Sequence, residues 1–324
     1  MKIDKDKIIN TITHLAKKIY EQGKKLWLSV KPWLKRIKIT PHWQNRLKQY
    51  ALMMRVDKPI GTLLLLWPTF WALWLASDGT PDVSLIIIFT LGVFLTRSAG
   101  CVINDYADRH LDNKVERTKT RPLTSGQISE KEALIVFAVL AFCAFLLVFF
   151  LDPLVMYLSV VAIILATIYP FMKRIIYFPQ AVLGAAFSMS IPMAYAATNG
   201  EIDNLAWLLF ICNLFWVIAY DTLYAMVDKE DDIKVGIKST AILFGEADLT
   251  IIAVIEGFFL FGMLLLGGRY DLNGWYYLGL LVATALFAWQ LYHCRKRQKN
   301  HCFIAFLNNN WVGFSIFCGI LLGR

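Results

Sequence analysis

Long apolar blocks, separated by short polar stretches, run through the chain from residue 60 to its end. Each block is close to the length of helix, roughly 20 residues, that crosses the hydrocarbon core of a bilayer. The expected fold is therefore all-α, a polytopic membrane protein. The pattern predicts nine transmembrane helices at 60–77, 83–103, 132–151, 153–170, 179–198, 205–227, 249–268, 274–293 and 302–322.

The composition and the placement of charge agree with this pattern. Of the 324 residues, 57% are hydrophobic and 18% are charged, whereas soluble proteins carry about a quarter charged residues. Thirty of the 33 Lys and Arg residues precede the first helix or fall in alternate loops, and the opposite loops hold only Arg269 and Arg324. Because cytoplasmic loops are rich in Lys and Arg, we expect a cytoplasmic N-terminus and an external C-terminus.

The net charge of +9 reflects this topology and the lipid surface, so no nucleic acid partner is expected. Residues 1–50 are Lys-rich, with Ile8, Ile12, Leu15 and Ile19 at helical spacing. We interpret them as a basic N-terminal extension, followed by a transmembrane domain at 51–324. An amphipathic basic helix would lie on the anionic inner leaflet; the alternative is a partly disordered basic tail.

An acidic cluster ends the second predicted helix. Asn104, Asp108 and Asp112 are spaced by four residues, and residues four apart share one face of a helix. Asp105 is turned about 100° away from that face. Carboxylates at the edge of a membrane segment are costly and usually functional.

A second cluster ends the sixth predicted helix, where Asp221, Asp228 and Asp232 also share a face. Both clusters fall on the predicted cytoplasmic side. Carboxylate and amide oxygens suit Mg²⁺, which binds one or two carboxylates and completes its shell with water and phosphate oxygens. Two facing sets therefore predict a metal–diphosphate site, although a single acidic loop would more often be solvated surface.

Basic side chains that could bind the diphosphate occur in the neighbouring segments, and Arg97 lies seven residues before Asn104 on the same helical face. The other candidates are Arg55, Lys58, Arg121, Lys173 and Arg174. Loss of diphosphate from an allylic chain leaves a carbocation, which a metal ion would favour as a Lewis acid and apolar walls would protect from water. The chain is thus expected to act on an isoprenoid diphosphate.

The residues that carry this site resemble a known family. Residues 104–112, 169–173 and 228–232, with the flanking stretches 57–61, 64–69, 220–228 and 236–245, are similar to the UbiA superfamily of intramembrane aromatic prenyltransferases. The similarity covers roughly residues 50 to 322. Within the superfamily it is greatest to bacterial enzymes that act on 4-hydroxybenzoate.

The resemblance implies nine transmembrane helices around a central cavity, with cytoplasmic cap loops and a lateral opening to lipid. It implies Mg²⁺ held through Asn104, Asp108, Asp228 and Asp232, with Asp112 nearby. It places Tyr169 and Lys173 near the diphosphate, makes Arg174 a candidate for the benzoate carboxylate and adds Tyr224 to the substrate-binding residues. Asp108, Asp228, Lys173 and Arg174 are the expected catalytic residues.

The implied reaction transfers a polyprenyl chain from polyprenyl diphosphate to the ring carbon ortho to the hydroxyl of 4-hydroxybenzoate, an early step of ubiquinone synthesis at the bacterial inner membrane. Another acceptor, such as a naphthoate, homogentisate or haem, is the first alternative. A cation-coupled transporter is the second, but transporters place ionisable sites near the bilayer midplane. For the carboxylate of the acceptor, Arg174 and Arg97 compete, since a guanidinium binds a carboxylate bidentately.

Overall fold

The computed structural model describes residues 40–114 and 118–324. The chain forms two compact units, Met1–Lys48 and Gln49–Arg324. The predicted amphipathic segment between Ile8 and Ile19 lies outside the described residues. The second unit contains the cavity and all the residues discussed below.

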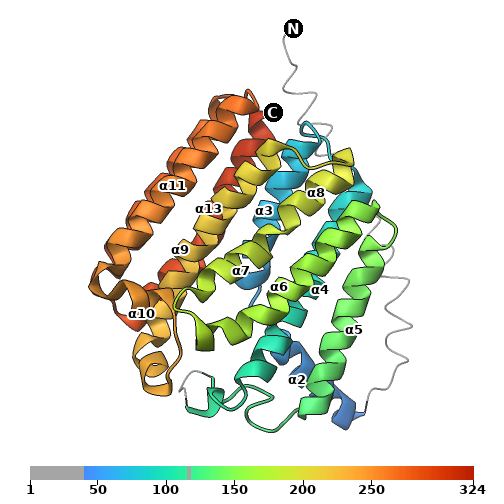
Figure 1. Ribbon diagram of the computed structural model, residues 1–324, viewed down its shortest axis with the longest axis vertical. Coiled ribbons are helices and arrows are strands. Elements are labelled where there is room, and N and C mark those ends of the chain that lie inside the picture. The colour runs from blue at the N-terminus through green and yellow to red at the C-terminus, as the bar shows by residue number, and fades with distance from the viewer. Residues whose placement is uncertain (1–39, 115–117) are drawn as a thin grey trace. The chain divides into compact units, whose positions relative to one another are not determined.

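The regular elements of the described residues are all helical, as the sequence predicts (Figure 1). Within residues 40–114 and 118–324, eight segments are long and apolar enough to cross a membrane, and the 17-residue helix α3 is a ninth, shorter one. The helices are α2 (Pro41–Met53), α3 (Ile60–Ala76), α4 (Val83–Asp108), α5 (Glu130–Val148), α6 (Pro153–Ile175), α7 (Pro179–Ser188), α8 (Ser190–Asn199), α9 (Asn204–Val235), α10 (Thr240–Phe244), α11 (Asp248–Arg269), α12 (Gly274–Cys294) and α13 (Lys299–Gly323).

One of the nine predicted spans, at 179–198, is interrupted. Helices α7 and α8 make one span with a break at Met189, three residues before Pro192. Proline cannot donate a backbone hydrogen bond and clashes with the preceding turn, which explains a break at this position. The predicted span at 249–268 is continuous as α11, and the short helix α10 and a 3₁₀ turn at Gly245–Ala247 precede it.

Three helices continue beyond the ends that hydrophobicity predicts. Helix α4 extends to Asp108, α6 to Ile175 and α9 to Val235. The apolar pattern stops where the chain leaves the bilayer, but the backbone stays helical until a residue ends it. For α9 that residue is Gly236, whose φ of 75° is left-handed and closes the helix. The acidic clusters therefore lie largely on rigid helix and not on loops.

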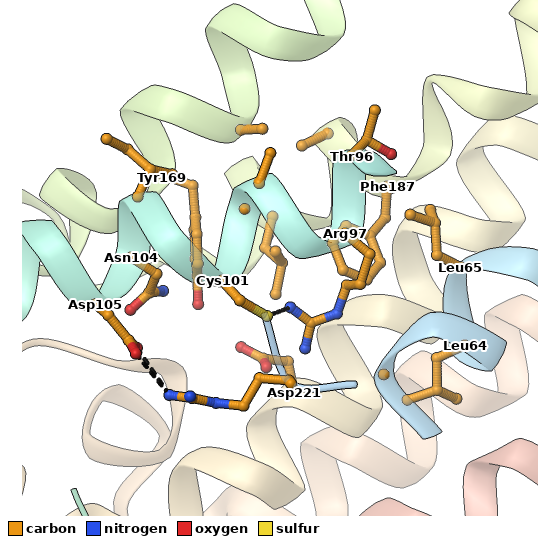
Figure 2. Close-up of a pocket in the computed structure, with 18 of the residues that line it drawn as sticks. Leu64, Leu65, Thr96, Arg97, Cys101, Asn104, Asp105, Tyr169, Phe187 and Asp221 are labelled. Carbon is orange, nitrogen blue, oxygen red and sulfur yellow. Dashed lines mark hydrogen bonds and ion pairs between the residues drawn. The ribbon is translucent and has the colours of Figure 1, made fainter. Parts of the chain in front are cut away.

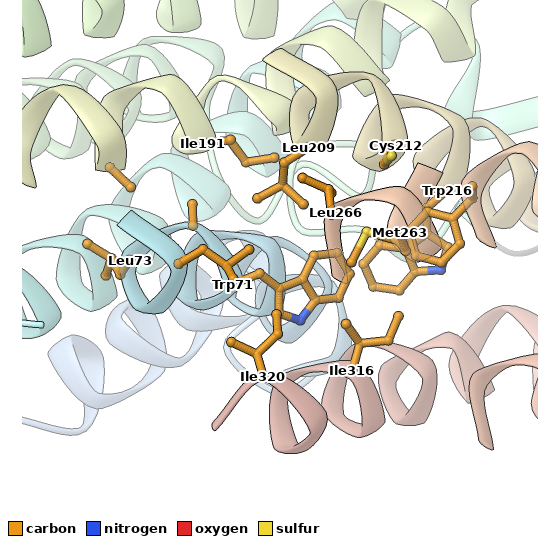
Figure 3. Packing of buried hydrophobic residues seen from close by; sticks show 14 of the residues in the cluster. Trp71, Leu73, Ile191, Leu209, Cys212, Trp216, Met263, Leu266, Ile316 and Ile320 are labelled. Atoms are coloured by element: carbon orange, nitrogen blue, oxygen red, sulfur yellow. The ribbon is translucent and has the colours of Figure 1, made fainter. Parts of the chain in front are cut away.

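A rigid aromatic core joins α3, α9, α11 and α13 on one side of the unit (Figure 3). Trp71 of α3 packs against Trp216 of α9 in a tilted arrangement, with ring centroids 5.2 Å apart. The Trp71 indole donates to the Gly313 carbonyl at 3.1 Å, and the Trp216 indole donates to Asn309 Oδ1 at 2.9 Å. In lipid, helix association depends on close packing and such hydrogen bonds more than on the hydrophobic effect.

Small residues bring other helices into direct contact. A side chain at Gly279 of α12 would lie 2.7 Å from the Ser315 carbonyl of α13, and one at Gly313 would lie 2.4 Å from the Trp67 ring. On the other side of the unit, α4, α5 and α6 lie side by side (Figure 1). The loop between α4 and α5 and the helix α10 lie at the same end of the unit (Figure 1). That end contains the acidic clusters.

Candidate active site

A cavity of about 1170 Å³ lies within the Gln49–Arg324 unit and extends along the inner faces of α4, α6 and α9. Of the thirteen site residues predicted from the sequence, Arg174 alone does not line it. The other twelve line this one cavity: Arg55, Lys58, Arg97, Asn104, Asp108, Asp112, Arg121, Tyr169, Lys173, Tyr224, Asp228 and Asp232. The structure thus brings together residues that are up to 177 positions apart in the sequence.

The first acidic set is split between two elements. Asn104 and Asp108 share the cavity face of α4, while Asp112 begins the 3₁₀ turn Asp112–Lys114 that follows. Thr118 fixes this turn by donating from its hydroxyl to the Asp112 carbonyl at 2.9 Å. Asp108 and Asp112 are only 4% and 5% exposed. Burial raises the pKa of the Asp112 carboxyl, and Arg121 opposes that rise.

Asp105 forms ion pairs with two of the basic side chains that the sequence predicts to bind the diphosphate. Arg55 donates to both of its carboxylate oxygens, at 2.8 and 2.9 Å, and Arg121 lies 3.0 Å from Asp105 Oδ1 and 2.8 Å from Asp112 Oδ2. Arg55 has a left-handed φ of 58°, which is uncommon for a residue with a side chain and is maintained by surrounding contacts. In the sequence, the position of Asp105 off the acidic face is a sign that it does something other than bind metal. The sequence does not reveal its partners, because Arg55 and Arg121 come from other segments.

Helix α6 supplies Tyr169 and Lys173 one turn apart. The Lys173 ammonium pairs with Asp108 Oδ2, and the Lys173 carbonyl accepts from the Lys238 backbone N–H at 2.7 Å. The second contact attaches the segment after α9 to α6. Arg174 points differently: its guanidinium donates to the Ala107 carbonyl, lies 3.8 Å from Asp108 Oδ1, and has a side chain 43% exposed.

The second acidic set lies along α9. Asp221 is buried, whereas Asp228 and Asp232 are half-buried. Within the described ranges, no three Asp, Glu, His or Cys side chains gather closely enough to hold a metal ion. An ion that shares its ligands with a diphosphate needs only one or two carboxylates from the protein. Asp108 Oδ1, buried and without a hydrogen bond, is such an available oxygen.

Arg97 lies in the wall of the cavity, facing α3 (Figure 2). A side chain at Gly61 of α3 would come within 2.5 Å of the Arg97 guanidinium, so glycine at this position makes room for it. The guanidinium contacts the Cys101 sulfur, while its Nε is buried without a hydrogen-bond partner. Figure 2 shows Arg97 and Asp221 among the residues that line the cavity. Arg97 thus retains an unused donor in an enclosed site.

Residues 65–312 match the UbiA prenyltransferase family. The chain belongs to this family. It is 53% identical over 287 residues to a 4-hydroxybenzoate octaprenyltransferase of Marinobacter nauticus, covering 88% of this chain and 98% of the relative. It is 52% identical over 285 residues to the protein of the same name in Pseudomonas fluorescens, covering 88% and 96%.

Solved structures of other family members share the fold. A UbiA homolog from Aeropyrum pernix superposes with a TM-score of 0.72 at 22% identity, covering 81% of this chain and 97% of that chain. A homolog from Archaeoglobus fulgidus, solved with GPP and Mg²⁺ bound, gives a TM-score of 0.63 at 15% identity, covering 83% and 99%. The UbiA arrangement of helices around a cavity is therefore the fold of this chain.

Proposed function

We propose that this protein transfers the polyprenyl chain of a polyprenyl diphosphate to the ring carbon ortho to the hydroxyl of 4-hydroxybenzoate, an early step of ubiquinone synthesis. The observation that carries the proposal is one cavity with carboxylates on two facing helices, basic side chains between them and apolar walls beyond. The names of the relatives, together with their identity over most of the chain, support 4-hydroxybenzoate as the acceptor.

Magnesium fits the residues present, and we propose Asn104, Asp108, Asp228 and Asp232 as its ligands, with Asp112 close by. All five offer oxygen atoms to one cavity, and hard oxygen ligands are those that Mg²⁺ prefers. When bound, the ion would neutralise charge that develops on the departing diphosphate. The Oδ1 of Asp108, buried and without a hydrogen bond, is consistent with a ligand that arrives together with the substrate.

The basic residues bind and orient the diphosphate in this proposal. Lys173 and Arg121 are paired with Asp108 and Asp112 in the present structure. A diphosphate between the acidic sets would take over Lys173 and Arg121, and this exchange would free the two carboxylates for metal. Arg55 and Lys58 add further positive charge to the lining of the same cavity. Preorganised cations of this kind stabilise the negative charge of the leaving group.

Arg97 is the side chain that best fits the carboxylate of the acceptor. It lines the cavity, whereas Arg174 does not. A carboxylate bound there would satisfy the buried Nε and receive a bidentate pair of hydrogen bonds. The aromatic ring would then lie among Tyr169 and Tyr224, close to the diphosphate end. The apolar walls beyond exclude water, which would otherwise capture the allylic cation.

The reaction is proposed to occur at the cytoplasmic side of the bacterial inner membrane, with residues 51–324 as the catalytic domain and residues 1–50 as an extension. The support is the charge asymmetry of the loops and the position of both acidic sets at one end of the unit (Figure 1).

The test uses purified protein in detergent with ring-labelled 4-hydroxybenzoate and octaprenyl diphosphate. We expect a prenylated product that requires magnesium and no ion gradient. Turnover of a naphthoate or homogentisate without turnover of 4-hydroxybenzoate would show that the acceptor is one of these compounds and not 4-hydroxybenzoate. Absence of prenylation with every acceptor, together with transport of cations in vesicles, would end the assignment as an enzyme.

A further inference from the structure

The cavity continues far beyond its acidic end. Along α4 it is lined from Ile88 to Asp108, which at 1.5 Å per residue is about 30 Å of helix. The half remote from the carboxylates is apolar and is bounded by α4, α5, α6 and α8. The residues that line this half include Phe89, Val93, Phe145, Val148, Ile163 and Met193. A molecule that fills the whole cavity has a charged head and a long apolar tail.

Two glycines of α4 face this space. A side-chain carbon built at Gly92 or at Gly100 meets no atom within 4 Å, and both residues line the cavity. Neither has a left-handed backbone. Glycine weakens the interior of a helix relative to alanine, so neither backbone geometry nor packing accounts for these two positions.

Gly257 offers a comparison, because it also lies in a helix with free space for a side chain but is not in the cavity. Gly257 of α11 also has free space in front of a side-chain carbon, but it is exposed on the outer surface and does not line the cavity. The space before Gly92 and Gly100 is continuous with Asp108, whose buried Oδ1 has no hydrogen-bond partner. The open space and the Asp108 carboxylate, whose Oδ1 accepts no hydrogen bond, therefore belong to the two ends of one binding site.

We infer that Gly92 determines the length of isoprenoid chain that the protein accepts. This inference rests on the proposed function, since the occupant is the tail of the diphosphate substrate. Gly100 lies one turn before Asn104, and Gly92 lies about 18 Å before it along the helix. With the diphosphate at the acidic end, the first isoprene units pass Gly100 and the later units pass Gly92. A side chain at Gly92 obstructs long chains selectively.

The experiment compares kcat/KM for octaprenyl diphosphate with kcat/KM for geranyl diphosphate in purified protein. For Gly92→Leu we expect the octaprenyl-to-geranyl ratio to fall by about tenfold or more, as filling an apolar pocket discriminates chains that occupy it. Gly257→Leu, the matched control, keeps the ratio of the parent protein. Gly92→Ala, which favours the helix, lowers the ratio in the same direction by a smaller factor.

A ratio that stays constant in Gly92→Leu and Gly92→Ala would overturn the inference, because the far half of the cavity would then hold membrane lipid or no ligand. A similar fall in Gly257→Leu would also overturn it, by showing a general effect of leucine in these helices. Should Gly92→Leu fail to fold, the ratio in Gly92→Ala decides alone. The proposed function fails separately, if the parent protein prenylates 4-hydroxybenzoate with neither diphosphate.

Discussion

At the scale of single residues, the polar end of the cavity contains ion pairs that a bound substrate can rearrange. Lys173, Arg121 and Arg55 each pair with an aspartate of the α4 segment. Buried charges are tolerated only when they are paired. A diphosphate can pair with the basic side chains, and its metal ion can pair with the aspartates. Binding of the two together can therefore replace these ion pairs without leaving any buried charge unpaired.

The metal ligands give the first prediction. Asp108→Ala and Asp228→Ala each remove one proposed oxygen ligand, on opposite sides of the cavity. We expect kcat to fall by about 100-fold or more in each, since lost stabilisation of developing charge has effects of this size. Product formation at limiting magnesium measures it, with membrane insertion as the control. Near-normal rates in either variant would contradict the ligand assignment.

The two arginines give the second prediction. Arg97→Ala should raise the KM for 4-hydroxybenzoate by about tenfold or more, because a charge-assisted hydrogen bond contributes about 1.5–3 kcal/mol. The KM for the diphosphate should change much less. Arg174→Ala is the comparison, and we expect a smaller effect on the acid. If Arg174→Ala alone raised the KM for the acid, the carboxylate would bind there.

The third prediction concerns Asp105, which orients Arg55 and Arg121 without lying on the acidic face. Asp105→Asn keeps the volume but removes the charge that holds both guanidinium groups. We expect the KM for the diphosphate to rise by about tenfold, while the KM for 4-hydroxybenzoate stays close to its original value. An equal rise in both constants would indicate a general disturbance of the fold.

At the scale of elements, the position of the α9 end depends on an ion-pair network outside the cavity. Asp248, fully buried at the start of α11, accepts from Arg297 Nε at 3.0 Å and lies 3.6 Å from Lys229 Nζ of α9. Lys229 also donates to the Gly245 carbonyl at 2.8 Å. Lys229 follows Asp228 directly, so these contacts set the position of a proposed metal ligand.

Asp248→Asn should therefore affect both stability and metal use. We expect the free energy of unfolding to fall by about 2 kcal/mol, the usual size for a lost hydrogen bond to a charged group. The magnesium concentration needed for half-maximal rate should also rise. Thermal unfolding in detergent and a magnesium titration measure the two effects. Lys234→Ala, which breaks an exposed pair with Asp231 on the same helix, should change neither.

At the scale of the whole molecule, the apolar exterior and the polar end of the cavity fit a bundle that takes its substrate from the membrane. Large apolar side chains are exposed on α6 and in the turn that precedes it, among them Phe150, Tyr157 and Ile164. Such a surface is stable only in contact with lipid. The basic loops at the end where the acidic sets lie predict that this end faces the cytoplasm.

Cysteine labelling tests this orientation. In a background without the native cysteines, Asp271→Cys lies in the turn between α11 and α12, and Ser125→Cys in the loop between α4 and α5. A membrane-impermeant thiol reagent applied outside intact spheroplasts should label Asp271→Cys and not Ser125→Cys. Inverted vesicles should give the reverse pattern. Labelling of Ser125→Cys from outside would place the acidic sets on the opposite side from the one proposed.

The sequence by itself determined the helical class, the nine spans and twelve of the polar residues that line the cavity, because the length of apolar runs and the spacing of carboxylates depend only on local geometry. Hydrophobicity could not reveal that α4, α6 and α9 continue as helix past the apolar runs, since those ends depend on backbone stops such as Gly236. Only the tertiary structure showed that Arg97 lines the cavity and Arg174 does not. It alone revealed the ion pairs of Asp105 and Asp248. Those contacts join segments far apart in the chain, and no local pattern encodes them.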